Sequence, residues 1–171
     1  MNKFALSALS AVALSASAFA GQPVVDAKDY KAMPEPCVND TELQVDIFGS
    51  YTDSIRGRYS DGFGGGLAVN YFFMRNLGVG VEGNLYDGDA NGVWSTGGRL
   101  IARFPIDCFV PYVFAAGGVQ ADGATVGYYS AGGGLEYRIV PQKVGIFAEG
   151  RYTWAENTPS SQVRAGVRVV F

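Results

Sequence analysis

Residues 163–171, at the carboxyl end of the sequence, read Val-Arg-Ala-Gly-Val-Arg-Val-Val-Phe. Counting back from Phe171, every second residue is apolar, and Arg164 and Arg168 occupy intervening positions. Because strand side chains point alternately to opposite faces, this pattern is typical of a β-strand with one apolar and one charged face. We expect such a strand to lie at a boundary between lipid and polar surroundings.

The first twenty residues have the features of a secretory signal peptide. Lys3 gives a positive start, residues 4–17 are uncharged and largely apolar, and Ala18-Phe19-Ala20 provides the small residues of a cleavage site. A transmembrane helix is the alternative, but this apolar run is short and is interrupted by serines. We therefore predict cleavage after Ala20, followed by an irregular arm over residues 21–41.

From Glu42 onward the sequence divides into segments of about ten residues separated by turn residues, the spacing of membrane-barrel strands. Eight segments fit: 42–52, 62–73, 77–85, 93–104, 110–120, 125–139, 144–154 and 163–171. In hydrocarbon every backbone amide needs an internal partner, and among sheets only a closed barrel provides one for all residues. The sequence therefore predicts an all-β fold for residues 42–171: an eight-stranded antiparallel up-and-down transmembrane β-barrel with both termini on one side.

The two faces of these segments differ in chemistry. One is almost free of charge, and the other is rich in glycine and carries the charged residues Asp46, Glu82, Arg99, Arg103, Glu136, Arg138, Glu149, Arg151, Arg164 and Arg168. Small residues on the charged face suit the narrow interior of an eight-stranded barrel, which side chains fill. We therefore expect a packed ion-pair network there and not a pore lining, with Glu82, Glu136, Glu149, Arg99, Arg138 and Arg151 at its centre. The pairing is left open because it depends on strand register.

Aromatic residues of the apolar face gather at the ends of the segments. One rim is expected to hold Tyr51, Phe63, Trp94, Tyr129, Tyr152 and Trp154, and the other Tyr71, Phe73, Phe104, Tyr112, Tyr137 and Phe171. Two such girdles match the two interfaces of a bilayer. In the fifth segment, where the alternation is least clear, we expect Tyr112 and Phe114 to point outward.

Two stretches carry a resemblance to a known group of proteins. Residues 71–80, Tyr-Phe-Phe-Met-Arg-Asn-Leu-Gly-Val-Gly, are similar to a hairpin of the small bacterial outer-membrane barrels of the outer membrane protein A and opacity type, and the terminal Val-Val-Phe resembles their last strand. The resemblance implies an outer-membrane location with a periplasmic amino terminus, contact with outer-membrane lipid and lipopolysaccharide, and recognition of Phe171 by the assembly machinery. No peptidoglycan-binding domain follows the barrel, so a cell-wall anchoring role is not implied, and the outer loops are shorter than in opacity-type adhesins.

Cys37 lies just before the first segment, and Cys108 lies between the fourth and fifth. With an even number of strands, both cysteines fall at the same mouth of the barrel, in an oxidising compartment. We predict a disulfide that draws residues 38–41 across this mouth. Two free thiols are the alternative.

The remaining motifs favour binding or structure over catalysis. Residues 87–92, Asp-Gly-Asp-Ala-Asn-Gly, match the first half of a calcium loop, but the twelfth position is Gly98 where a glutamate is needed, so we expect a hairpin and no metal. The first outer loop, with Arg56, Arg58 and Tyr59, could touch lipopolysaccharide phosphates or a host ligand, and a solvated hairpin is its default interpretation. The chain has no histidine, which argues against an enzyme, and its net charge of −3 without a basic cluster argues against nucleic acid.

We therefore expect a non-enzymatic, monomeric outer-membrane barrel without cofactors, with a filled polar interior and a structural or surface-contact role. Two alternatives remain open at this point. One is a narrow channel for small solutes or ions, and the other is a secreted lipocalin-like barrel that binds ligands in an apolar interior.

Overall fold

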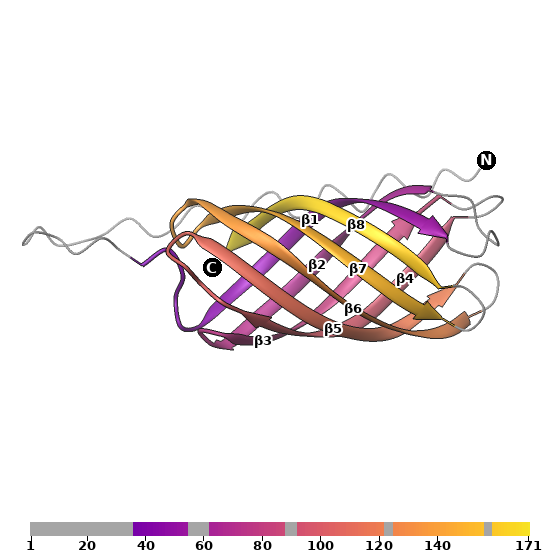
Figure 1. Cartoon of the computed structure of the whole chain (residues 1–171), viewed down its shortest axis with the longest axis horizontal. Helices are drawn as coiled ribbons and strands as arrows, with labels where there is room; N and C mark the ends of the chain where they lie inside the picture. Colours follow the sequence, from indigo (N-terminus) through magenta and orange to yellow (C-terminus); the bar gives the residue numbers. More distant parts are fainter. Residues whose placement is uncertain (1–35, 55–61, 88–91, 122–124, 156–158) are drawn as a thin grey trace, which may run out of the picture. The chain divides into compact units, whose positions relative to one another are not determined.

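The computed structural model describes residues 36–54, 62–87, 92–121, 125–155 and 159–171, and all of them belong to a single barrel (Figure 1). Its strands are β1 (Glu42–Ser54), β2 (Gly62–Met74), β3 (Leu77–Tyr86), β4 (Val93–Arg103), β5 (Phe109–Ala121), β6 (Thr125–Val140), β7 (Val144–Ala155) and β8 (Ser160–Val170). The expected signal peptide, most of the expected arm, the first outer loop with its arginines and the centre of the expected hairpin at 87–92 lie outside the described residues.

Each strand pairs with its sequence neighbours in antiparallel fashion, and β1 pairs with β8 to close the sheet. The closing register sets Val45 opposite Val169 and Ser50 opposite Arg164. The predicted fold class, a closed eight-stranded up-and-down barrel, is therefore confirmed. We call the mouth that holds residues 36–41 and the turns at 75–76, 104–108 and 141–143 the turn end, and the opposite mouth the loop end.

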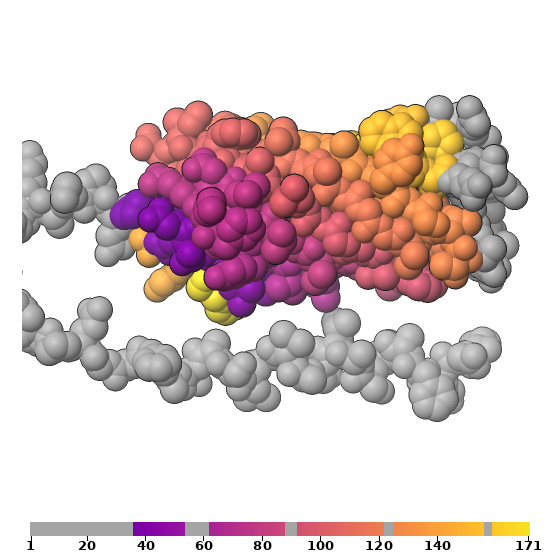
Figure 2. All heavy atoms as spheres, turned by 90° about the horizontal axis from the view of Figure 1, so that it is seen from below, coloured from indigo at the N-terminus to yellow at the C-terminus, as the bar shows by residue number. Residues whose placement is uncertain are grey.

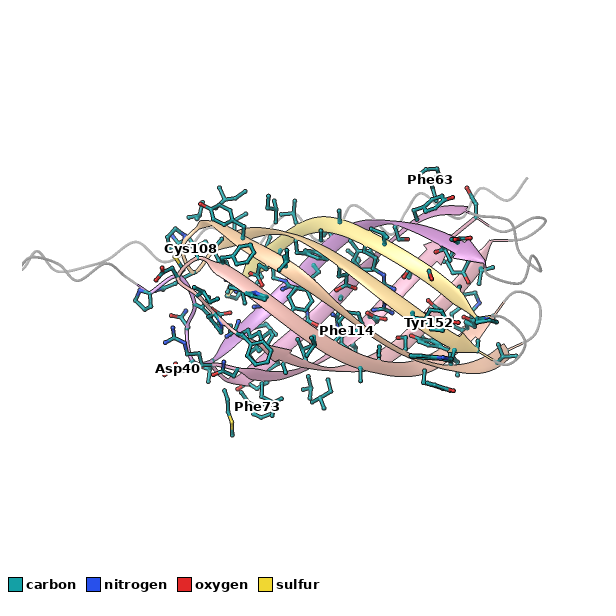
Figure 3. All side chains as sticks on the ribbon, viewed as in Figure 1. Asp40, Phe63, Phe73, Cys108, Phe114 and Tyr152 are labelled. Carbon is teal, nitrogen blue, oxygen red and sulfur yellow. A yellow bond between two sulfur atoms is a disulfide. The ribbon has the colours of Figure 1, made fainter. Side chains whose placement is uncertain are left out.

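The two faces of the sheet lie as the alternation requires. Large apolar side chains such as Leu67, Val81 and Leu135 are at least half exposed on the outside of the barrel, whereas charged side chains are buried inside it. Phe63 and Phe73, near the two ends of β2, point away from the barrel, while Phe114 points into it (Figure 3). Side chains pack continuously over the face seen in Figure 2. Within the described ranges, no helix is long and apolar enough to cross a membrane.

The expected orientation of the aromatic residues in β5 is wrong. Tyr112 and Phe114 are 3% and 5% exposed and face the interior, and Val113 faces outward between them. Both faces of β5 are apolar near this point, so alternation carries no signal there. What decides the orientation is the neighbouring strand: Gly134 pairs with Tyr112 and Gly132 with Phe114.

Interior glycines make room for the aromatic rings. A Cβ atom added at Gly132 would lie 2.7 Å from Cζ of Phe114, and one added at Gly134 would lie 2.6 Å from the Tyr112 hydroxyl. Phe48 packs against two glycines. A Cβ atom added at Gly66 would lie 2.7 Å from Cζ of Phe48, and one added at Gly166 would lie 2.8 Å from its Cβ. These approaches are closer than carbon atoms tolerate, so the rings fit only where a neighbouring strand has no side chain.

Candidate functional site: the charged barrel interior

Five charged side chains meet across the middle of the lumen, and we call them the central cluster: Glu82, Glu149, Arg99, Arg151 and Arg164. Arg151 donates Nη1 to Oε1 of Glu82 at 2.5 Å and Nη2 to Oε2 at 2.7 Å, and Arg164 Nη1 donates to the same Oε2 at 3.0 Å. Arg99 joins the two carboxylates, at 3.4 Å from Glu82 and 3.1 Å from Glu149. Because the members come from β3, β4, β7 and β8, the cluster connects opposite walls of the barrel.

Six further charged side chains fill the lumen nearer the turn end, and we call them the turn-end cluster: Glu42, Asp46, Glu136, Arg103, Arg138 and Arg168. Arg168 donates Nε and Nη2 to the two oxygens of Asp46 at 2.6 and 2.7 Å, and Nη1 to Glu136 at 2.6 Å. Arg138 forms ion pairs with Glu136 and, at 2.9 Å, with Glu42. Three carboxylates and three arginines balance each other in charge.

Arg103 joins the wall of the barrel to the segment that crosses its mouth. Its Nη1 donates to Glu42 at 2.5 Å, its Nη2 to the carbonyl of Asn39 at 3.0 Å and its Nε to the carbonyl of Arg75 at 2.6 Å. The guanidinium also lies 3.8 Å from the centre of the Phe72 ring. The planar, five-donor arginine head is suited to serve several acceptors and one ring at once.

A disulfide and one hairpin turn hold residues 36–41 at the turn end. Cys37 is bonded to Cys108, with a Cα–Cα distance of 5.0 Å, and the predicted disulfide is therefore confirmed. Gln142, in the turn between β6 and β7, donates its backbone N–H to the carbonyl of Cys37 at 3.2 Å and its Nε2 to the carbonyl of Pro36 at 2.9 Å. Val38, the residue after Cys37, is 2% exposed.

Aromatic rings contact the guanidinium groups of the central cluster. Phe114 lies 4.3 Å from Arg99 and 4.9 Å from Arg151, and Phe48 lies 4.6 Å from Arg164. A cation over a ring face is attracted by the negative charge density of that face. The rings therefore fill the lumen and also stabilise the buried arginines.

All ten charged residues expected inside the barrel lie inside it, and none is more than 6% exposed. They divide into two clusters, however, and Glu136 and Arg138 belong to the turn-end cluster and not to the centre with Glu82 and Arg99. Glu42 completes the turn-end cluster and was not predicted, although it shares its face with Gln44 and Asp46 and this parity was a usable signal. Gln142 was also missed, and a lone turn glutamine gives no local signal of its role.

The aromatic residues expected at the two rims, Tyr112 excepted, point away from the lumen. At the loop end Tyr51 pairs with Phe63, with ring centres 5.1 Å apart, and Tyr129 stacks on Trp154 at 5.3 Å. Exposed rings at the turn end belong to Tyr71, Phe73, Phe104, Tyr137 and Phe171, and Trp94 adds an exposed ring on β4.

The charged groups of the interior engage mainly one another. Carboxylates and guanidinium groups form ion pairs with one another. In the part of the chain that the structure describes, there is no group of three or more His, Cys, Asp or Glu side chains that could hold a metal. Of the calcium-like hairpin, Asp87 and Gly92 are described, and residues 88–91 between them are not. The central cluster and the turn-end cluster together fill the lumen of the barrel.

The structure of this chain is similar to solved structures of β-barrel proteins. No protein-family model matches the chain, and no curated protein matches its sequence. Neisserial surface protein A is similar in structure, with a TM-score of 0.63 and 22% identity over 78% of this chain and 99% of that one. The chain has the fold of the small outer-membrane β-barrels.

Two further barrels support the same conclusion. The N-terminal β-barrel domain of Pseudomonas aeruginosa OprF matches with a TM-score of 0.60 and 19% identity, over 76% of this chain and 97% of that one. Ail, the attachment invasion locus protein of Yersinia pestis, matches with a TM-score of 0.56 and 14% identity, over 78% and 100%. At these identities the likeness concerns the fold, and the resemblance inferred from residues 71–80 and the final strand is confirmed at that level.

Proposed function

We propose that this protein is a non-enzymatic component of a bacterial outer membrane, in which the barrel spans the bilayer with a sealed lumen. A structural or surface-contact role in the envelope fits such a body. The outward-facing apolar band, flanked by exposed aromatic rings, supports the membrane position, because a bilayer stabilises that arrangement and water does not. The polar interior argues against a lipocalin-like barrel with an apolar binding cavity.

The central cluster is the observation that carries the sealed lumen. Glu82 on β3 and Arg151 on β7 face each other across the barrel and are joined by two hydrogen bonds. Passage of an ion through this level requires separation of a buried ion pair, which leaves an unpartnered charge and is costly. The cap formed by Val38 and the disulfide supports closure at the turn end as well.

The orientation and partners follow from the same proposal. Residues 1–20 act as the signal peptide, the turn end with Cys37 and the arm faces the periplasm, and the loop end faces outward toward lipopolysaccharide. Phe171 exchanges backbone hydrogen bonds with Leu43 at 2.8 and 3.2 Å, so the pairing with β1 continues one residue beyond β8. This position supports a role for Phe171 in recognition by the assembly machinery, and a barrel without a free strand edge supports a monomer.

Two measurements test the proposal. Membrane fractionation should recover the protein only with detergent, and unheated samples should migrate differently from heated ones on gels, since the closed barrel resists unfolding. Recovery in the soluble periplasmic fraction would contradict the membrane position. In planar bilayers the purified protein should leave the conductance at its baseline, and steady single-channel openings would favour the narrow channel instead.

A further inference from the structure

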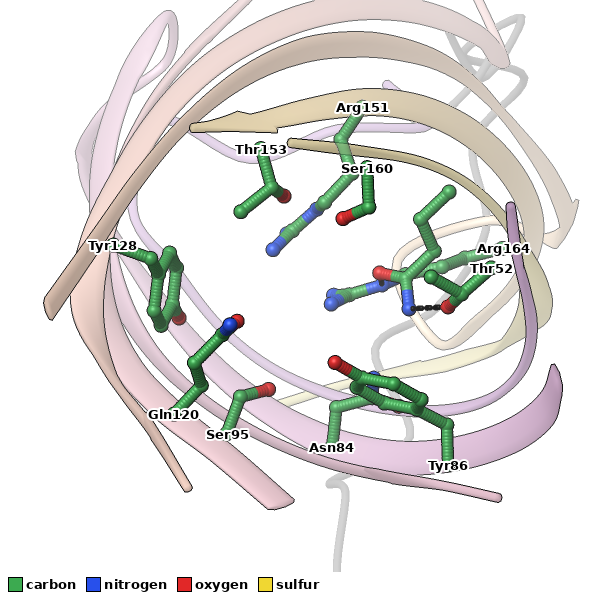
Figure 4. A pocket seen from close by; sticks show the side chains of 11 residues that line it. Thr52, Asn84, Tyr86, Ser95, Gln120, Tyr128, Arg151, Thr153, Ser160 and Arg164 are labelled. Carbon is green, nitrogen blue, oxygen red and sulfur yellow. Dashed lines mark hydrogen bonds between the residues drawn. The ribbon is translucent and has the colours of Figure 1, made fainter. Parts of the chain in front are cut away.

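A polar pocket opens above the central cluster on the side of the loop end. Arg151 and Arg164 point into it, and Ser95, Gln120, Tyr128 and Thr153 are among its walls (Figure 4). The other lining groups are also hydroxyls and amides, and none of the described side chains that line the pocket is a carboxylate. The pocket is thus lined by two cations and by neutral hydroxyl and amide groups, each of which can donate a hydrogen bond.

The charge beneath the pocket is not balanced. The central cluster contains three arginines and two glutamates, whereas the turn-end cluster is balanced, so the described interior carries one excess positive charge. Both oxygens of Glu82 are engaged, since Oε1 accepts from Arg151, and Oε2 accepts from Arg151, Arg164 and Arg99. Oε2 of Glu149 accepts from Arg99 at 3.1 Å and from the Tyr112 hydroxyl at 3.0 Å.

An excess cation inside a barrel is unfavourable unless a partner neutralises it. The arginines are 2–6% exposed, and Nε of Arg151 is buried without a hydrogen-bond partner. Both Arg151 and Arg164 line the pocket, so a neutralising group bound there would contact the cluster that carries the excess charge.

We propose that this pocket binds one small inorganic anion, of the size of chloride, which neutralises the excess charge of the central cluster. Size supports the assignment: the cavity volume is about 20 Å³, and a single water needs roughly 10–15 Å³ by the same measure. A monatomic anion therefore fits, held by the guanidinium groups and the surrounding hydroxyl and amide donors. The proposal concerns the folded barrel and stands whether or not the protein conducts.

The test uses the full chain purified in detergent, crystallised with sodium bromide in place of chloride. An anomalous difference peak within hydrogen-bond distance of Arg151 or Arg164 is expected inside the pocket. In solution the thermal midpoint should rise with sodium chloride and reach a plateau, compared with sodium gluconate at equal ionic strength, because gluconate is too large to enter.

The decisive variant supplies the missing negative charge from the wall of the pocket. Gln120→Glu should fold and should remove the bromide peak. The chloride concentration that gives half of the rise in thermal midpoint should increase by about tenfold. Thr125→Glu adds the same charge at an exposed position of the loop end and should leave both signals unchanged. Arg164→Gln should also remove the chloride effect. If Arg164→Gln does not fold, the result for Gln120→Glu alone decides whether the pocket binds the anion.

Three results would overturn the proposal. They are the absence of bromide from the pocket in the unsubstituted chain, equal midpoints in chloride and gluconate, and full bromide occupancy in Gln120→Glu. A bromide peak confined to the barrel surface is an adventitious ion only and counts as absence from the pocket.

Discussion

Glu82 on β3 and Arg151 on β7 form a two-point ion pair across the lumen, with N–O distances of 2.5 and 2.7 Å, although 69 residues separate them in the sequence. The two strands lie on opposite sides of the eight-membered barrel, so this pair braces the barrel through its middle. Arg164 and Arg99 use the same carboxylate, which makes Glu82 the shared acceptor of three arginines.

Glu82→Gln should therefore be strongly destabilising, because it leaves three buried arginines with a single carboxylate. We expect a loss of about 3–5 kcal/mol in the free energy of unfolding, measured by urea unfolding in lipid vesicles. Asp87→Asn removes the same charge from an exposed position just beyond β3 and should cost less than about 0.5 kcal/mol. Equal effects of the two substitutions would mean that the central cluster contributes no special stability.

Arg103→Lys should loosen the cap at the turn end. Lysine keeps the charge but lacks the planar fork that reaches Glu42, Asn39 and Arg75 together, so we expect a loss of about 1–3 kcal/mol. Hydrogen exchange should speed up at residues 38–42 before it does so at the loop end. Arg75→Lys, on an exposed side chain of the same turn region, serves as the control and should change neither quantity.

Reduction of the Cys37–Cys108 disulfide should lower the temperature at which the barrel loses its heat-modifiable migration on gels. The bond closes a loop with a sequence separation of 71, for which chain entropy gives a contribution of about 4 kcal/mol. The barrel itself should remain closed in the reduced state, since its strands pair without the bond. A Cys37→Ser, Cys108→Ser double variant should behave like the reduced protein and show no response to reductant.

Gly132→Ala should destabilise the barrel, because a Cβ at this position meets the Phe114 ring at 2.7 Å and also crowds the carbonyl of Gly150. We expect a cost of about 1–3 kcal/mol from overpacking. Gly150→Ala is the matched control, since a Cβ there meets nothing within 4 Å and points to the outer face. If both variants unfold at the same urea concentration, the close packing of the Phe114 ring against Gly132 does not contribute to the free energy of unfolding.

Val81→Arg tests which solvent covers the outer wall. Val81 is 62% exposed near the middle of β3, and an arginine at the bilayer midplane costs about 2–4 kcal/mol. Unfolding from lipid vesicles should show this cost, whereas Thr125→Arg at the exposed loop end should be nearly neutral. A negligible cost for Val81→Arg would place that face in water and contradict a lipid-facing wall.

Most strand boundaries follow from the alternation and turn residues of the sequence. Seven of the eight expected segments agree with the observed strands within two residues at either end, and β8 begins earlier, at Ser160. Alternation failed in β5, because both faces of this strand are apolar: Val110 and Phe114 face the lumen and Val113 faces outward. The glycines of β6 decide which face of β5 points into the lumen. Glu42 was also left unassigned, although its alternation with Leu43 places it on the same face as Gln44 and Asp46.

The sequence by itself determined the period-two alternation, the number of strands, the face on which the ten predicted charged residues lie and the mouth where Cys37 and Cys108 meet. These are local properties, since side-chain direction along a strand depends only on position within it. Only the tertiary structure decided that Glu82 meets Arg151, that Glu42 joins Arg103 and Arg138, and that three arginines share two glutamates beneath the pocket. Those contacts cross the lumen between strands that are not hydrogen-bonded to each other, and their level is set by the stagger with which the barrel closes.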